Sequence, residues 1–270
     1  MRKSRKRRFL FVAYTASVAA VALTLAGCAN CPQSDIFSAP YAVVYVNEAP
    51  VIDGKLDDPA WQQAAVLDTF YEFGKTAVRF PGDVKAMIVW DAENLYFGIT
   101  VKDKDIFVAS RGRDPKVCGS DAVELFLKPP VVTEYETELY EFEFNAWEAI
   151  WDIHYLGCGG GSAAVRFSAD YNPAIVCKAT HTGTINNGLD KDEEYTVEVS
   201  IPLSAFSHAV PDGVKPGDVW KFNVAGYDFS VYRRNPALFT TMPGKASGFS
   251  QYELFTQMKF MPFENALPSR

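Results

Sequence analysis

The sequence is poor in the residue types that form most metal and nucleophilic sites. Its 270 residues include only three histidines and five cysteines. The histidines, His154, His181 and His208, are scattered and show no spacing typical of zinc ligands. No Ser–His–Asp or Cys–His arrangement stands out either. We therefore expect no metal ligands among these residues and no nucleophilic hydrolase.

Clustered positive charge is absent beyond the first eight residues. The chain has 26 basic and 33 acidic side chains, a net charge of −7, and Met1–Arg8 alone carries six Lys/Arg. Nucleic-acid binding depends on clustered Lys and Arg that neutralise phosphates. The sequence therefore excludes nucleic acid as a partner.

Only one long apolar run is present, from Phe9 to Ala26, directly after the basic residues. A basic segment followed by such a run is typical of a secretory signal. The run ends in Leu-Ala-Gly-Cys28, which resembles a bacterial lipoprotein signal. The resemblance implies removal of residues 1–27, lipidation of Cys28 and a membrane anchor in the cell envelope. Ala29 after the cysteine implies the outer membrane in a Gram-negative host; an uncleaved anchor or an ordinary signal peptide are the alternatives.

The cysteines predict little more. Residues 28–40 form a short tether, and the C-x-x-C of Cys28 and Cys31 lacks the partners of a zinc or thioredoxin site. In an exported compartment, Cys118, Cys158 and Cys177 allow one internal disulfide, and the sequence does not decide which pair forms it.

Patterns for long helices are missing, and alternation of apolar and polar residues dominates. Val84–Trp90 and Leu95–Val101 flank a turn and predict a β-hairpin. Further strands are predicted at 122–128, 139–147, 150–155, 174–182, 195–201, 220–229 and 253–261. Many short strands in series indicate an all-β fold, an antiparallel β-sandwich with one or two short helices. One domain is expected over residues 41–264.

The stretch VIDGKLDDPAW (residues 51–61) predicts a strand end, a turn at Asp53-Gly54 and a short helix. Pro59 suits the first helical position, and Asp57 or Asp58 is expected to cap the helix.

The alternation of apolar and polar residues also predicts which face of each strand lies in the core. Tyr140, Phe142 and Phe144 are expected in the core, whereas Glu141, Glu143 and Asn145 share the opposite face, where most polar positions are expected to be solvated.

Six segments resemble carbohydrate-binding family 9-like (CBM9-like) domains, a group that overlaps DOMON-like domains. In order along the chain, they are VIDGKLDDPAW (51–61), the hairpin from Met87 to Asp105, SDAVELFLKP (120–129), YEFEFNAWEAIWD (140–152), YTVEVSIPLSAF (195–206) and KPGDVWKFNVAGYD (215–228). The resemblance spans about residues 41–262. It implies a jelly-roll-like sandwich, a structural role for Trp61 and a sugar-binding module without catalytic activity.

The resemblance also implies a binding site, from which this sequence departs. Characterised members sandwich a sugar between two tryptophans, but the segment before Asp121 contains no aromatic residue and the last loop has only Phe249 and Tyr252. Polar candidates remain at motif positions and in the nearby loop. The expected carbohydrate-binding residues are Arg111, Arg113, Asp121, Glu124, Asn145, Asn223, Phe249 and Tyr252.

Structural roles compete with these assignments. Asp121 could cap a turn and Glu124 could pair with Lys221, while Trp147 and Trp151 could form a replacement sugar platform or pack in the core. Asp121 and Glu124 are three apart on a strand and so face opposite sides, which argues against a glycosidase pair.

Cofactors are not required by the sequence. Calcium is known in the family that the sequence resembles. The candidate calcium ligands are the acidic clusters at Asp103/Asp105 and at 190–194, and neither cluster has the EF-hand pattern. A haem-binding electron-transfer module is one alternative, with Met87, Met242, His154 and His181 as candidate ligands. A structural or protein-binding lipoprotein is another. The preferred interpretation is a lipid-anchored envelope protein that binds an oligosaccharide or polysaccharide in support of glycan degradation.

Overall fold

The computed structural model describes residues 39–75, 83–133, 137–157, 166–168 and 170–263. The chain divides into two units, Met1–Ile36 and Phe37–Arg270. The predicted signal peptide, Cys28 and most of the tether lie outside the described residues. No helix in the part that the structure describes is long and apolar enough to cross a membrane.

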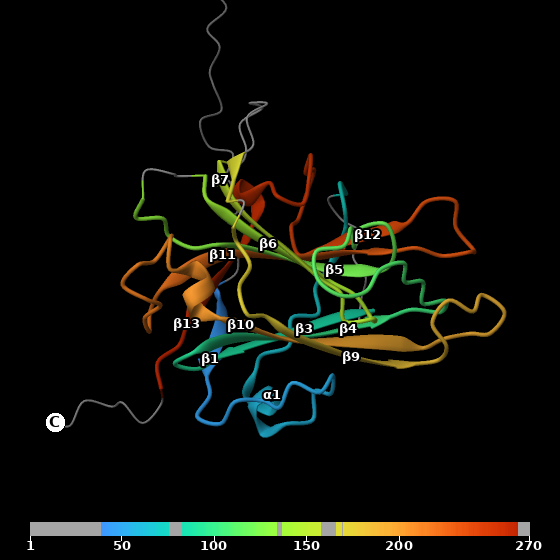
Figure 1. The fold of residues 1–270 in the computed structure, drawn as a ribbon, viewed down its shortest axis with the longest axis horizontal. Helices are drawn as coiled ribbons and strands as arrows, with labels where there is room; N and C mark the ends of the chain where they lie inside the picture. The colour runs from blue at the N-terminus through green and yellow to red at the C-terminus, as the bar shows by residue number, and fades with distance from the viewer. Residues whose placement is uncertain (1–38, 76–82, 134–136, 158–165, 169, 264–270) are drawn as a thin grey trace, which may run out of the picture. The chain divides into compact units, whose positions relative to one another are not determined.

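The unit Phe37–Arg270 is a β-sandwich with its strands in two layers (Figure 1). One α-helix, α1 (Pro59–Gln63), and two 3-10 turns, η1 (Leu203–Phe206) and η2 (Tyr252–Leu254), accompany the strands, which confirms the predicted class. The strands are β1 (Tyr41–Tyr45), β2 (Tyr71–Glu72), β3 (Val84–Trp90), β4 (Asn94–Lys102), β5 (Ala122–Lys128), β6 (Leu139–Phe144), β7 (Ile150–Gly157), β8 (Arg166–Phe167), β9 (Val176–Thr182), β10 (Glu194–Pro202), β11 (Val219–Asp228), β12 (Ala237–Thr240) and β13 (Thr256–Phe260).

The strand order is β8-β7-β6-β5-β11-β13-β1-β3-β4-β10-β9, with β12 beside β11 and β2 beside β12. Sheet A consists of β8, β7, β6, β5, β11 and β13, together with β12 and β2. Sheet B consists of β3, β4, β10 and β9. Strand β1 belongs to both, since Tyr41–Val43 pairs with β13 and Val44–Tyr45 pairs with β3. Both pairings are parallel, whereas the other pairs of the strands named above are antiparallel as predicted.

The core fills the space between the two sheets because each strand turns its alternate apolar residues inward. Tyr140, Phe142 and Phe144 of β6 lie in this core, as the alternation predicted. Trp220 and Phe222 join them from β11, which is separated from β6 by β5. Each of these five side chains is almost completely buried.

The segment around α1 covers the outer face of sheet B and is held by one carboxylate. Glu198 of β10 accepts hydrogen bonds from the backbone N–H groups of Asp53 and Gly54, both at 2.8 Å, and from Trp61 Nε1 at 2.9 Å. Glu198 and Trp61 are buried, which confirms the structural role of the tryptophan. Gly54 has a φ of +89°, and a Cβ there would lie 2.8 Å from the carbonyl carbon of Ala179 on β9, so this close approach requires glycine.

Two details of this segment differ from the prediction. Residues 51–54 are not a strand, because their backbone N–H groups bond to side chains instead of to a neighbouring strand. Asp58 precedes α1 but does not cap it: its Oδ2 accepts a hydrogen bond from the N–H of Val51 at 3.1 Å. Pro59 does occupy the first turn, and the turn at Asp53-Gly54 is present, with Asp53 Oδ1 bonded to the N–H of Lys55.

Cys118 and Cys177 are free thiols, and Cys177 is buried. These two residues therefore do not form the internal disulfide that the sequence allowed. Cys158 lies outside the described residues.

We expect Glu198→Ala to lower the free energy of unfolding by about 2–4 kcal/mol, because it leaves three donors without an acceptor, of which the Gly54 N–H and Trp61 Nε1 are buried. Urea unfolding followed by tryptophan fluorescence measures this loss. Glu48→Ala, at an exposed glutamate, is the control and should change stability by less than about 0.5 kcal/mol. Equal stabilities of the two variants would contradict the assigned role of Glu198.

Candidate functional site

Three glutamates lie together on the outer face of sheet A and form what we call the carboxyl row. Glu124 of β5 is directly opposite Glu143 of β6. Glu141 lies two residues before Glu143 on the same strand, and so on the same face of the sheet. Carboxylate oxygens of all three lie within 4.8 Å of one another. Their exposed fractions are only 2%, 2% and 8% for Glu124, Glu143 and Glu141. The prediction that the polar face of β6 is solvated is therefore wrong at both of its glutamates.

Hydrogen bonds link the carboxyl row to its surroundings. Tyr227 of β11 bonds to Glu124, and Tyr155 of β7 bonds to Glu141. Glu143 lies between the other two carboxyls and accepts a hydrogen bond from the backbone N–H of Cys118. Its Oε2 atom is buried without a hydrogen-bond partner among the described residues. The row is thus a chain of carboxyls with tyrosines at both ends.

Burial changes the acidity of all three glutamates. Loss of hydration raises the pKa of Glu141 to about 7, and the same cause together with the charge of Glu141 raises that of Glu143 to about 7. Burial and the neighbouring Glu143 raise the pKa of Glu124 well above its usual range. Near neutral pH the row therefore holds protons, and its carboxyls can donate as well as accept hydrogen bonds.

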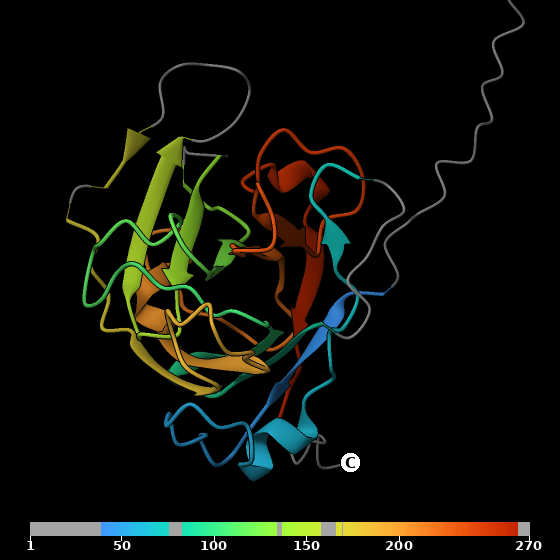
Figure 2. The same cartoon turned by 90° about the vertical axis from the view of Figure 1, so that its right-hand side faces the viewer.

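Aromatic side chains surround the row. Trp151 of β7 lies beside Glu143 in the sheet register, and its side chain is partly exposed, like those of Tyr155 and Tyr227. On the other side, a second apolar cluster contains Phe126, Phe249 and Phe255. This cluster forms where β2 and the loop containing η2 lie next to each other (Figure 2).

Phe249 and Tyr252 are placed near the row, where the two rings differ in exposure and in their neighbours. The Phe249 ring is 9% exposed and packs between Phe73, at 4.7 Å between ring centroids, and Tyr227, at 5.6 Å. The Tyr252 ring has the Lys128 ammonium 4.8 Å from its centroid. Phe249 is therefore a packing residue in this structure, and Tyr252 remains partly exposed.

The two predicted asparagines hold backbone segments in place. Asn223 Oδ1 accepts hydrogen bonds from the hydroxyls of Thr240 and Thr241, and its Nδ2 donates to the carbonyl of Phe249. Asn145 Oδ1 accepts from the N–H groups of Trp147 and Ala149, which shapes the turn before β7. Both side chains are fully buried, and their amide groups bond to other parts of the protein.

The two predicted arginines lie away from the carboxyl row. The Arg111 guanidinium carbon is 3.8 Å from the centroid of the Trp147 ring. Arg113 forms an ion pair with Asp152 and donates to the carbonyl of Pro173 at 3.1 Å. Glu124, in turn, does not pair with Lys221, since Lys221 is opposite Lys128 and Glu124 is opposite Ala225.

Asp121 belongs to a different group of carboxylates, which we call the aspartate cluster: Asp103, Asp121 and Asp228, with oxygens within 4.8 Å of one another. Asp121 accepts hydrogen bonds from the N–H groups of Phe107 and Phe229, so it does hold turns. Burial and the charge of Asp103 raise its pKa to about 9. Asp121 and Glu124 therefore lie in separate groups, which agrees with their predicted opposite orientation.

A cavity of about 740 Å³ lies beside the aspartate cluster, and the carboxyl row does not line it. Asp103, Asp105, Asp192 and Asp228 contribute acidic groups to its wall, and the wall also includes the exposed Tyr232. The sequence predicted Asp103 and Asp105 as an acidic pair. Asp121 and Asp228 are distant from Asp103 in the sequence, and only the fold brings them next to it.

The four candidate haem ligands occupy different parts of the sandwich. Met87 packs against the apolar cluster that contains Trp61 of α1. Met242 packs in the cluster that contains Phe249. His181 is exposed on β9, whereas His154 is buried beside Glu138. The structure therefore does not bring these residues together as a pair of axial ligands.

Glu141 and Glu143 are the site residues that sequence reasoning missed. Their alternation with Tyr140, Phe142 and Phe144 marked them as outward-facing, which is correct. One signal for their role was present in the sequence: the next predicted strand before them, 122–128, also carries a glutamate, Glu124. Only the register shows that the two strands put their glutamates side by side.

Stability should fall as pH rises through the range in which the row loses its protons. The folded-state pKa values of Glu141 and Glu143 lie near 7 and the unfolded ones near 4.5, so the folded state binds more protons between these values. We expect the free energy of unfolding to decrease by on the order of 1–3 kcal/mol from pH 5 to pH 8, with a shallower decrease in Glu143→Gln.

Urea unfolding at a series of pH values measures both slopes. Glu193→Gln, at an exposed glutamate, is the control and should keep the wild-type slope. Parallel curves for the wild type and Glu143→Gln would show that Glu143 does not titrate in this range.

Comparisons with known proteins agree with the sandwich fold. The family described as carbohydrate family 9 binding domain-like matches residues 52–246, and no curated protein matches the chain. A similar solved structure is a protein from Bacteroides uniformis ATCC 8492 proposed to bind carbohydrate, with 15% identity, a TM-score of 0.57 and coverage of 81% of this chain and 97% of that one. A family 9 carbohydrate-binding module from Caldicellulosiruptor kristjanssonii is similar in complexes with cellotriose and with glucose.

Identity to this module is 17% in both complexes. The TM-scores are 0.53 with cellotriose and 0.51 with glucose, and 86% and 84% of this chain are covered, with 98% of the module in each case. These likenesses agree with the sandwich fold described above. Since the family model spans most of the sandwich, the chain belongs to the carbohydrate family 9 binding domain-like family.

Proposed function

We propose that this protein binds an oligosaccharide or polysaccharide, without cleaving it, at the carboxyl row on the outer face of sheet A. The observation that carries the proposal is the position of Glu124, Glu141 and Glu143 beside the partly exposed rings of Trp151, Tyr155 and Tyr227. Aromatic rings contact the apolar faces of sugars, and a few fixed polar groups bond to the hydroxyls.

The positions of the missing tryptophans support the same location. The segment before Asp121 reaches the row through the N–H of Cys118, which bonds to Glu143. The last loop reaches its other side through Phe249, which packs on Tyr227 and Phe126. Neither segment presents a tryptophan, so Trp151 is the aromatic residue best placed to contact a sugar.

A binding role suits the row better than catalysis. Glycosidases use two carboxyl groups about 5–5.5 Å or about 6.5–9.5 Å apart, on either side of the scissile bond. Here the three carboxyls lie on one surface, with oxygens within 4.8 Å, and they are almost completely buried. Such groups can orient hydroxyls from one side only.

Binding of the unit 37–270 to cello-oligosaccharides, followed by a panel of plant, algal and host glycans, tests the proposal by calorimetry. We expect saturable binding that weakens at least about tenfold in both Trp151→Ala and Glu143→Gln, which remove a stacking surface and a carboxyl group that bonds to hydroxyls. Tyr232→Ala, in the wall of the separate cavity, is the control and should bind like the wild type.

Two results would overturn the proposal. Loss of binding in Tyr232→Ala alone would move the site to the cavity beside the aspartate cluster. No binding to any glycan would favour a protein-binding lipoprotein, and a Soret band in the same preparation would favour the haem-binding alternative.

We also infer that Ca²⁺ binds at the aspartate cluster. Calcium prefers carboxylate oxygens, and Asp103, Asp121 and Asp228 supply three of them. Asp103 Oδ2 is buried without a hydrogen-bond partner among the described residues, and a bound cation would satisfy it.

Thermal unfolding in Ca²⁺ and in EGTA tests this second site. We expect Ca²⁺ to raise the Tm of the wild type and of Glu143→Gln, because a ligand that binds only the folded state stabilises it. The increase should disappear in Asp103→Asn. A calcium response that Asp103→Asn keeps, or that Glu143→Gln abolishes, would exclude the aspartate cluster as the site.

We further propose that Cys28 is lipidated and holds the sandwich in the cell envelope, at the outer membrane in a Gram-negative host. The support is the sequence around residues 1–28, with its basic start, its apolar run and Leu-Ala-Gly before the cysteine. A lipid anchor would keep the binding face close to the cell, where enzymes that degrade the glycan could use it.

A further inference from the structure

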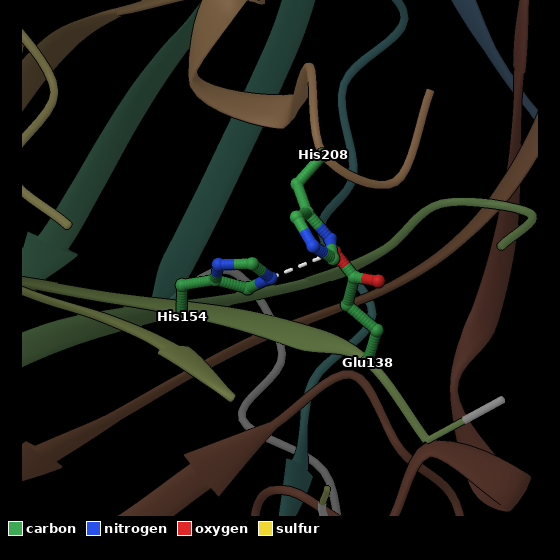
Figure 3. A group of neighbouring side chains, drawn as sticks. All are labelled: Glu138, His154 and His208. Carbon is green, nitrogen blue, oxygen red and sulfur yellow. Dashed lines mark hydrogen bonds and ion pairs between the residues drawn. The ribbon is translucent and has the colours of Figure 1, made fainter. Parts of the chain in front are cut away.

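A second polar group lies on the opposite side of β6 and β7, at the inner face of sheet A. It consists of Glu138, directly before β6, His154 of β7 and His208, two residues after η1, and we call it the histidine–glutamate triad (Figure 3). The residues come from three segments that are 16 and 54 positions apart in the sequence. The fold alone brings them together.

Both imidazoles approach the same carboxylate oxygen. His154 Nε2 lies 2.7 Å and His208 Nδ1 lies 2.9 Å from Glu138 Oε1. One ligand atom from each of the three side chains falls within 4.8 Å of the other two. Two nitrogens and one oxygen in such an arrangement are the donor set of many zinc and non-haem metal sites.

Packing fixes two of the three side chains. The His154 ring stacks on Tyr140 with 4.3 Å between ring centroids and 3° between planes. The His154 side chain is only 5% exposed and that of Glu138 is completely buried. Glu138 is further oriented by the hydroxyls of Tyr140, at 2.8 Å from Oε1, and Thr133, at 3.1 Å from Oε2. Partners of this kind hold metal ligands in position.

His208 provides access from the solvent, since its side chain is 47% exposed. A tetrahedral ion at about 2.0–2.1 Å from each donor separates its ligands by about 3.3 Å. The observed distances from Glu138 Oε1 are 2.7 and 2.9 Å, so each nitrogen would need to move away from this oxygen by about 0.4–0.6 Å. A small shift at the exposed residue could accommodate much of this change.

We propose that Glu138, His154 and His208 bind a Zn²⁺-type divalent transition-metal ion, with water as the fourth ligand on the exposed side. The ion lies between the imidazoles and Glu138, and each neutral imidazole then carries its proton on its other ring nitrogen. It joins the start of β6, the middle of β7 and the segment after η1, and so stabilises this end of the sandwich. The site is independent of sugar binding, because Tyr140 and His154 face the core whereas Glu141 faces the outside.

The test uses the unit 37–270 with its purification tag removed, treated with a chelator and supplied with excess Ca²⁺ to fill oxygen-only sites. Calorimetry with Zn²⁺ should give one equivalent bound, and Zn²⁺ should raise the Tm. His208→Gln should bind Zn²⁺ at least about a hundredfold more weakly, since the loss of an outer partner alone costs about 10- to 100-fold. Because His208 is half exposed, this variant is expected to fold.

The exposed His181 on β9 provides the matched control. His181→Gln should bind Zn²⁺ like the wild type. The chain has only three histidines, so NMR of the imidazoles resolves each one, and Zn²⁺ should shift the signals of His154 and His208 but not that of His181. Absence of Zn²⁺ binding to the wild type, or undiminished binding to His208→Gln, would overturn the proposal and leave the triad as a hydrogen-bonded contact.

Discussion

The pairing of β5 with β6 is the constraint on which both faces of sheet A depend. In the observed register Glu124 is opposite Glu143, and Leu125 is opposite Phe142. A slip of one residue would exchange the two faces of a strand and put carboxyls among the core aromatics. The apolar inner positions therefore fix the register, and the register in turn assembles the carboxyl row. The site exists because the core permits only one alignment.

Strands β6 and β7 consequently carry two kinds of chemistry back to back. Outward-facing Glu141 and Glu143 lie among tyrosines and a tryptophan, while inward-facing His154 stacks on Tyr140 at the edge of the core. Different parts of the chain bury the two faces of sheet A. The outer face is covered by side chains from β11 and from the loops around β2 and η2, whereas the inner face is closed by the opposite sheet and η1.

The strands were predictable because alternation and aromatic residues are local signals, and β3, β4, β5 and β10 match the predicted ranges within one residue. Strand β1 was missed, since its five residues show no clear alternation and are fixed by parallel partners far along the chain. At the candidate site, Glu124 was singled out through its motif, and its role in binding stays a prediction. The burial of Glu141 and Glu143, the backbone-holding roles of Asn145 and Asn223, and the meeting of His154 with His208 all depend on long-range contacts that no local pattern contains.

Strand β1 also has a consequence for the order of events during synthesis. Tyr41 pairs with Met258, so the first strand of the sandwich needs a partner from its last strand. Contacts between such distant residues form late, because a long loop must close first. Sheets A and B can be joined along β1 only after almost the whole chain has been made. The sandwich is therefore completed only when synthesis of the chain is nearly finished, and until then sheet B lacks its connection to sheet A.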